Sequence, residues 1–243
     1  MATSCSSPNP PLHGADAKEP VVPAILFGSI GTIVDTSELQ REAFNEAFAQ
    51  HDLEWKWDRV EYQSMLDTSG GCSRIAEYAR QRSETVDASA IHATKSDCFQ
   101  VRMSRSGLVP RAGVADAIHA AKNNGYQVAL VTTTSPSNVR ALFAGLSSTI
   151  DANLFDLIVD ASQVDAPKPH PAAYTFAIER LGVAASNCVA VEDNLDGLTA
   201  ALAAGVSSVA FPNANTAGHD FTAAVDVVES VDFARLQEHL SAR

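Results

Sequence analysis

Five short apolar runs constrain the fold of this chain more than any other feature. The runs lie at residues 24–27, 128–131, 154–159, 189–191 and 208–211. Stretches with helical periodicity are interleaved with them at 113–124, 171–181 and 196–204. Strands buried on both faces are almost continuously apolar, so this alternation indicates a parallel sheet covered by helices on both faces. The sequence therefore predicts an α/β fold.

One interval of about ninety residues, from Ile33 to Gln127, lacks any strand-like run. Ser37-x-x-Gln40 has the form of a capping box, and an apolar helical face follows it, with further helical patterns at 74–82 and 88–105. A helical insertion after the first strand is expected to cover the carboxyl ends of the strands, where open α/β sheets bind ligands. The predicted organisation is a disordered tail (1–22), a core domain (23–37 and 108–243) and a helical cap domain (38–107).

The net charge restricts the classes of partner that the chain can bind, and the cysteines indicate the compartment in which it is found. The net charge of −12 argues against nucleic acid or an anionic membrane as a partner, and the predicted cap contributes −3 of it. No apolar run approaches the roughly 20 residues that span a bilayer. The four cysteines are scattered without a C-x-x-C pair, which predicts free thiols and a cytoplasmic location.

Four motifs occur in a characteristic order: FGSIGTIVDTSE, VALVTTTSPSNV, DAPKPHPAAY and CVAVEDNLDGLTAALAAGV. Together they resemble the haloacid dehalogenase (HAD) superfamily, in its β-phosphoglucomutase-like branch and nearest to the xylulose-1,5-bisphosphate phosphatases. The resemblance covers nearly everything from residue 23 onward. It implies a HAD-like Rossmannoid parallel sheet with an inserted helical cap, and Mg²⁺-dependent hydrolysis of sugar phosphates.

The first motif departs from the family pattern F-D-x-D-G-T at both aspartates. Gly28 stands where the resemblance implies the nucleophile, and Ile30 where it implies the acid/base. Ser29 is a weak substitute because no histidine lies near it in sequence, and Asp35 matches a later aspartate of the family. The sequence therefore predicts that both catalytic carboxylates are lost and that the chain is not an active enzyme.

The second and third motifs keep the side chains that the resemblance assigns to phosphate binding: Thr132, Thr133 and Lys168. The threonines could equally be turn residues, and a lysine in a proline-rich loop is commonly solvated. The match to the motif favours an inward-facing Lys168 that has lost one of its acidic partners at position 28.

In the cap, Thr68 to Arg74 matches the substrate-specificity stretch of the resemblance. Gly70 and Gly71 would allow a close backbone approach, and Arg74 could bind a phosphate through its planar guanidinium. A glycine turn before a helix with a solvated arginine explains the same residues equally well. Cys72 stands where the xylulose-bisphosphate enzymes have a lysine, so one positive charge is lost.

Glu192 and Asp193 follow the strand-like run 189–191, where the resemblance places metal carboxylates. Acidic residues there could instead cap the next helix. Without a carboxylate at position 28, Mg²⁺ would keep too few anionic ligands, so its binding is expected to be weakened or lost.

Three functions remain open on the sequence. The leading interpretation is an inactive HAD-like phosphatase homologue, or pseudoenzyme, that binds a small phosphorylated metabolite or a protein partner. The alternatives are an active Mg²⁺-dependent sugar-phosphate phosphatase with a non-standard nucleophile, and a structural assembly protein.

Overall fold

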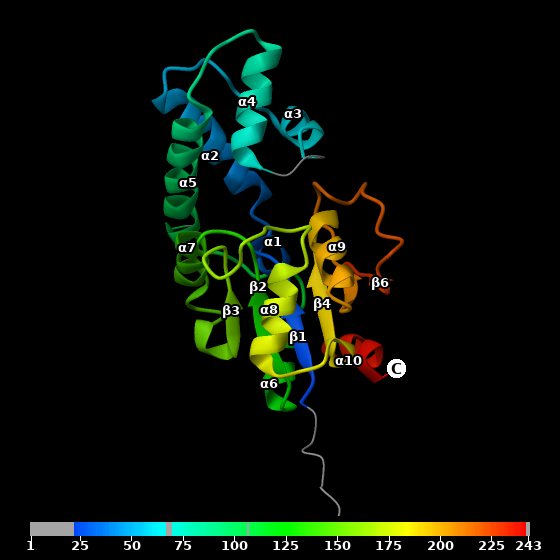
Figure 1. Cartoon of the computed structure of the whole chain (residues 1–243). Helices are drawn as coiled ribbons and strands as arrows, with labels where there is room; N and C mark the ends of the chain where they lie inside the picture. The colour runs from blue at the N-terminus through cyan, green and yellow to red at the C-terminus, as the bar shows by residue number, and fades with distance from the viewer. Residues whose placement is uncertain (1–21, 67–69, 106, 242–243) are drawn as a thin grey trace, which may run out of the picture.

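Six parallel strands form one sheet in the computed structural model, which describes residues 22–66, 70–105 and 107–241. The strands are β1 (Ala24–Phe27), β2 (Gln127–Val131), β3 (Leu157–Val159), β4 (Cys188–Glu192), β5 (Ser207–Ala210) and β6 (Asp226–Val227). Their order across the sheet is β3-β2-β1-β4-β5-β6 (Figure 1). The predicted α/β fold with a parallel sheet is confirmed.

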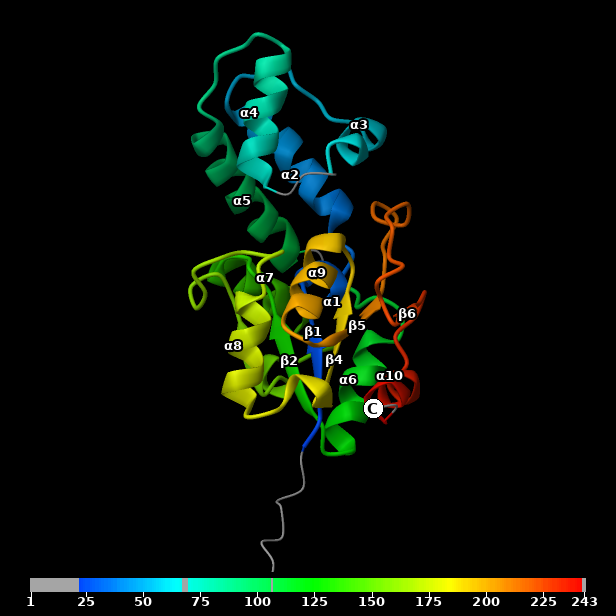
Figure 2. The ribbon, with the colours of Figure 1, turned by 45° about the vertical axis from the view of Figure 1, so that its right-hand side comes forward.

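Helices cover both faces of the sheet, as the apolar strands require. On one face lie α6 (Val114–Asn123), α7 (Pro136–Leu146) and α10 (Phe233–Ser241). On the other lie α8 (Ala172–Leu181) and α9 (Leu195–Ala203), and Figure 2 shows the sheet between α8 and α10. Because side chains alternate along β1, Ile25 and Phe27 pack against the first group of helices, whereas Leu26 packs against the second.

The register of the central strands brings their carboxyl ends together. Phe27 of β1 is paired with Leu130 of β2 and Val191 of β4, so the residues that follow these strands meet at one edge. The Gly28 amide continues the pairing by donating to the Val191 carbonyl at 2.9 Å. The sites predicted after three separate strands therefore lie side by side.

Four helices stand beyond this edge, and we call them the cap: α2 (Ser37–Gln50), α3 (Arg59–Ser64), α4 (Gly71–Gln81) and α5 (Ala88–Arg105) (Figure 1). One helical turn, α1 (Ile30–Ile33), leads into them from β1. The cap has its own apolar cluster, dominated by the rings of Phe44, Phe48, Trp55, Trp57 and Tyr62. Its longest helix, α5, also packs against α7 of the core.

Several local predictions differ from the structure. The run 154–159 is a strand only at 157–159, because residues 152–154 form a 3-10 turn, and the short edge strand β6 was not predicted. The prediction of a capping box at Ser37-x-x-Gln40 is wrong. Thr36 is the N-cap of α2, and the side chain of Gln40 bonds Lys95 instead of the backbone. Residues 1–21 of the predicted tail lie outside the described residues, as do Thr68 and Ser69.

Three of the cysteines, Cys72, Cys98 and Cys188, are free thiols, as expected. Within the described ranges, every helix is too short or too polar to cross a membrane.

Candidate functional site

The two positions that depart from the HAD motif are both buried at the end of β1. Gly28 contributes only backbone there, and Ile30 is 7% exposed within the apolar core beneath α6 and α7. A side-chain carbon added at Gly28 would overlap the carboxylate of Glu192. The space expected for a nucleophile is therefore filled by an acidic side chain from β4.

Glu192 is fully buried and bonds two partners through the same oxygen. Lys168 Nζ and the Tyr174 hydroxyl both donate to Oε1, each at 2.6 Å. Burial raises the pKa of the Glu192 carboxyl, although Lys168 acts in the opposite direction. Burial beside Glu192 likewise raises the pKa of the Tyr174 phenol. Tyr174 was not predicted as a site residue, because its place on α8 suggests only packing.

Lys168 points inward, as the motif suggests, but its donors are all engaged. Besides Glu192, its ammonium donates to the carbonyl of Val131 at 2.7 Å and to the carbonyl of Gly28. The side chain is 8% exposed. Since an ammonium has three N–H groups, these three acceptors leave none for an external phosphate.

Asp193 is buried at the same edge and is surrounded by neutral donors. Its Oδ1 accepts from the Ser29 hydroxyl at 2.6 Å, the Asn194 amide at 3.0 Å and the Thr32 hydroxyl at 3.3 Å. Its Oδ2 accepts from the Asn213 amide at 3.3 Å. These donors direct hydrogens at the carboxylate, where a cation would need free lone pairs.

The described residues do not fit a divalent cation, although hydrolases of this type typically use Mg²⁺. Glu192 is turned away to Lys168, and Asp193 already accepts four hydrogen bonds. Within the part of the chain that the structure describes, no three His, Cys, Asp or Glu side chains gather in a metal-binding group. The predicted pair Glu192 and Asp193 is adjacent in sequence but faces different partners.

Ser29 has a structural part in this arrangement. It is the N-cap of α1, and its Oγ accepts from the Thr32 amide at 3.0 Å while donating to Asp193. Asp35, the other candidate substitute, is exposed and accepts from the Ser37 amide at 3.0 Å. Ser29 thus has a potential base in Asp193, but that oxygen of Asp193 also accepts from Asn194 and Thr32, and the Ser29 oxygen caps α1.

Replacing Ser29 by alanine is expected to destabilise the protein by about 2 kcal/mol in urea unfolding, since a cap and a bond to a charged group are both lost. Ser135→Ala is the matched control, because Ser135 caps α7 in the same way without touching a carboxylate. Ser135→Ala should lower the free energy of unfolding by about 1 kcal/mol. Equal losses in the two variants would contradict the structural role of the Ser29–Asp193 bond.

The predicted phosphate-binding threonines lie at the same edge. Thr132 is buried, and its Oγ1 accepts from the Thr134 amide at 3.2 Å, whereas Thr133 is half-buried. Thr134 in turn accepts from Asn138 at 2.7 Å, and Asn138 accepts from Gln100 of α5 at 3.1 Å. Hydrogen bonds thus connect this loop to the cap. Phosphate binding by these residues stays a prediction.

A cationic cluster in the cap was only partly predicted. Arg74 lies in the first turn of α4. Its guanidinium carbon is 5.7 Å from the centre of the Tyr62 ring, and its Nε donates to the Met65 carbonyl at 2.9 Å. Lys95 of α5, which sequence reasoning missed, is 6% exposed between the rings of Phe44 and Phe99. Its position on the stripe 91, 95, 99 places a lysine on an apolar helix face, which is the signal that could have found it.

Burial lowers the pKa of Lys95 to about 8, and Arg74 contributes in the same direction. Burial also lowers the pKa of His92, which lies against Gly71, and Lys95 and Arg74 add to this effect. Among the described residues, no carboxylate forms an ion pair with Lys95, and its hydrogen-bond partner is the neutral Gln40 at 2.7 Å. Lys95 is therefore a buried cation with a neutral hydrogen-bond partner in an acidic protein.

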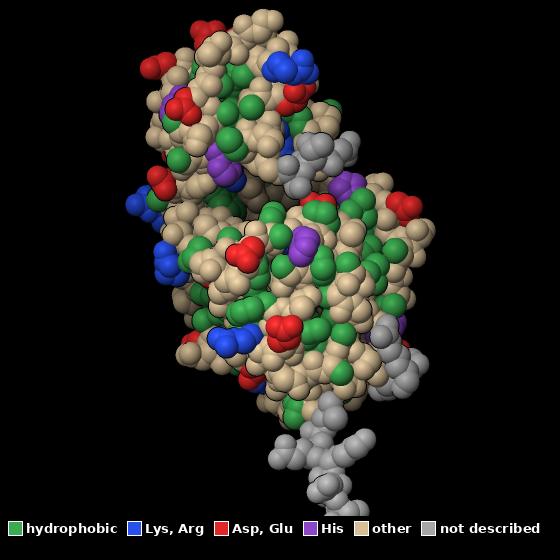
Figure 3. Space-filling model, viewed as in Figure 1, with side chains coloured by type: hydrophobic (Ala, Val, Ile, Leu, Met, Phe, Trp, Pro, Cys, Tyr) green, Lys and Arg blue, Asp and Glu red, His purple; other side chains and the backbone are tan. Residues whose placement is uncertain are grey.

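The cluster lies toward the core, because Gln40 and Arg74 belong to the first turns of α2 and α4, which begin at the end of the cap nearest the sheet (Figure 1). Figure 3 shows the surface hollowed between the cap and the core. Gln63 of α3 bridges this gap by donating to Asn215 at 2.8 Å. The helix ends that carry the cap cluster thus lie on the side of the cap that faces the sheet edge (Figure 1).

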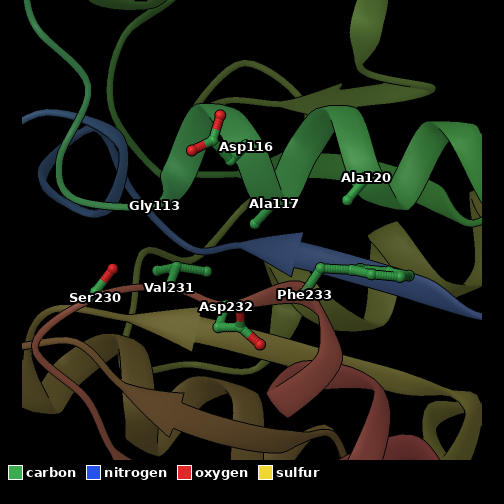
Figure 4. A pocket seen from close by; sticks show the side chains of 8 residues that line it. All are labelled: Gly113, Asp116, Ala117, Ala120, Ser230, Val231, Asp232 and Phe233. Carbon is green, nitrogen blue, oxygen red and sulfur yellow. The ribbon is translucent and has the colours of Figure 1, made fainter.

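A separate cavity of about 270 Å³ lies between α6 and the segment before α10. In Figure 4, Ala117 and Ala120 face the segment that carries Val231 and Phe233. None of the predicted site residues lines it, so it does not belong to this site.

The sequence of the chain matches the haloacid dehalogenase-like hydrolases over residues 22–205, and the chain belongs to this family. It is 37% identical over 219 residues to the protein CbbY of Cereibacter sphaeroides, covering 89% of this chain and 94% of that protein. It is 32% identical over 222 residues to a CBBY-like protein of Arabidopsis thaliana, covering 86% of this chain and 69% of that protein.

Solved structures agree with this assignment. The structure of CbbY from Rhodobacter sphaeroides in complex with phosphate has a TM-score of 0.77 at 37% identity, with 88% of this chain and 96% of that chain covered. A mutant of that protein in complex with xylulose-(1,5)bisphosphate also gives a TM-score of 0.77 at 37% identity, with 86% and 94% covered. The predicted superfamily and branch are therefore supported, and a HAD phosphatase-like character is shared with these relatives.

Proposed function

We propose that this chain is a non-catalytic member of the HAD family that binds a phosphorylated sugar without hydrolysing it. The observation that carries the binding is the buried ammonium of Lys95, which has a neutral hydrogen-bond partner and lies near Arg74. A buried cation is costly unless an anion compensates it, so a phosphate in the hollow would be the natural partner. The CbbY structures with phosphate and xylulose-(1,5)bisphosphate favour the same ligand class.

The absence of hydrolysis is inferred from positions 28 and 30. Phosphoryl transfer in this family, as the resemblance implies, needs a carboxylate nucleophile and a neighbouring proton shuttle. Gly28 and Ile30 supply neither, and Asp193, the carboxylate that accepts from the Ser29 hydroxyl, is already bonded by three further donors. The neutral donors around Asp193 support binding that does not depend on Mg²⁺.

A second candidate is an active Mg²⁺-dependent sugar-phosphate phosphatase, which the identity to CbbY favours. It would require a non-standard nucleophile, such as Ser29 with Asp193 as its base. The two candidates differ in whether inorganic phosphate is released, whereas both include ligand binding. If the chain binds a protein partner instead of a sugar phosphate, neither phosphate release nor sugar-phosphate binding should be observed.

The test is a thermal-unfolding series with a panel of sugar monophosphates, with and without Mg²⁺, alongside an assay of phosphate release. A ligand at 100 times its dissociation constant adds about 2.7 kcal/mol, which should raise Tm by about 5–10 °C. Arg74→Ala should lose this shift, and the matched control Arg80→Ala, at an exposed position of the same helix, should keep it. No shift with any sugar phosphate would contradict the proposal and favour a protein partner.

A further inference from the structure

The environment of Glu192 indicates which ligands the hollow accepts. Its carboxylate neutralises Lys168 at 2.6 Å, and carbonyl oxygens occupy the other donors of that ammonium. The sheet edge therefore already contains the anion that balances its own cation. A phosphate arriving there would meet no free N–H group of Lys168 and would face a buried carboxylate.

Two glycines make room for this carboxylate. Side-chain carbons added at Gly28 on β1 or at Gly197 on α9 would each overlap the end of the Glu192 side chain. Its Oε2 lies in this space, and within the described residues it has no hydrogen-bond partner. The carboxylate thus fills a volume that only glycine at both positions leaves open. The cap cluster differs, because its Lys95 has no carboxylate partner among the described residues.

We propose that Glu192 is a specificity-determining residue that takes the place of a ligand phosphate at the sheet edge. The site then binds a sugar through a single phosphate, held at the cap, and a second phosphate on the sugar adds no affinity. This rests on the proposed function as far as the cap is concerned. The claim about the sheet edge stands on Glu192, Lys168 and Gly28 alone.

The first test adds inorganic phosphate to the full chain carrying Lys95→Met. This substitution removes phosphate binding at the cap, so that any stabilisation by phosphate comes from the sheet edge. Phosphate should not stabilise this variant against thermal unfolding. Adding Glu192→Ala, which removes both charge and volume, should create phosphate-dependent stabilisation, and adding Lys168→Met to that variant should abolish it. Glu192→Gln, which keeps the volume, should gain much less. Lys168-dependent stabilisation with Glu192 intact, or no gain with Glu192→Ala, would overturn the proposal.

The second test needs only protein with Lys95 intact. Calorimetric titration should give similar affinities for glucose 1-phosphate and glucose 1,6-bisphosphate in the wild type, whereas Glu192→Ala should prefer the bisphosphate by about tenfold or more. A tenfold preference for the bisphosphate in the wild type would overturn the proposal even if Glu192→Ala does not fold. If neither sugar phosphate binds, the proposed function fails, and the inorganic phosphate test still decides the role of Glu192.

Discussion

Replacing Lys95 by methionine is expected to stabilise the folded protein and at the same time to remove its affinity for sugar phosphates. Methionine has a similar length and fits the apolar stripe between Phe44 and Phe99. The wild-type ammonium has a pKa of about 8 in the folded state, against 10.5 for an ordinary lysine. That difference corresponds to a gain of about 3 kcal/mol in the free energy of unfolding at neutral pH.

The sign of this effect depends on pH. Between pH 8 and 10.5 the unfolded chain holds a proton on Lys95 that the folded chain has released, so the stability contributed by this group rises with pH. The difference between Lys95→Met and wild type should therefore be largest at pH 7 and vanish near pH 10.5. Urea unfolding at several pH values measures it, with the exposed Lys56→Met as control. A destabilised Lys95→Met at pH 7 would contradict the buried charge.

The affinity for a phosphorylated ligand should depend on the protonation of the same residue, Lys95. A phosphate next to Lys95 favours the charged ammonium, so affinity should fall as pH rises above about 8. Arg74 remains charged throughout this range, and His92 is already neutral because burial lowers its pKa. The decline can therefore be assigned to Lys95, and an affinity that stays constant from pH 7 to pH 10 in calorimetric titration of the wild type would contradict this assignment.

Gly28→Ala is expected to be more destabilising than Gly28→Asp, although alanine is the smaller residue. The added methyl group must displace Glu192, which leaves Lys168 buried without a carboxylate. Breaking a buried ion pair in this way costs about 3–5 kcal/mol. Aspartate displaces Glu192 as well, but its own carboxylate can take over Lys168, so the loss should be clearly smaller.

Chemical denaturation of the two variants measures this order. Gly218→Ala is the control, because nothing lies within 4 Å of the position where its side-chain carbon would be. It should change stability by less than about 1 kcal/mol. If Gly28→Ala were as stable as wild type, Glu192 could not occupy the space at position 28.

The alternation of apolar runs and helices was sufficient to predict the parallel sheet, because strands buried on both faces leave a clear mark in sequence. It failed at 154–159, where the chain turns before the strand begins, and at β6, where the two residues Asp226 and Val227 carry no apolar run. The motifs placed Thr132, Lys168 and Asp193 at one edge, because parallel strands in register end together.

The partners within the site could not be predicted in the same way. Sequence indicated that Lys168 had lost an acidic partner at position 28, whereas the structure supplies one from Glu192, 24 residues later in the chain. Tyr174 and Gly197 complete that arrangement from two different helices. Such substitution of one carboxylate by another depends on side-chain packing across elements, which no local pattern records.

The most direct test of non-catalytic binding is a ³¹P NMR time course of the purified protein with a sugar monophosphate and Mg²⁺. The ester signal should broaden or shift on binding and keep its full intensity, with no inorganic phosphate appearing over many hours. Release of inorganic phosphate at ordinary enzymatic rates, about 1 s⁻¹ or faster and unchanged by repurification, would contradict the account.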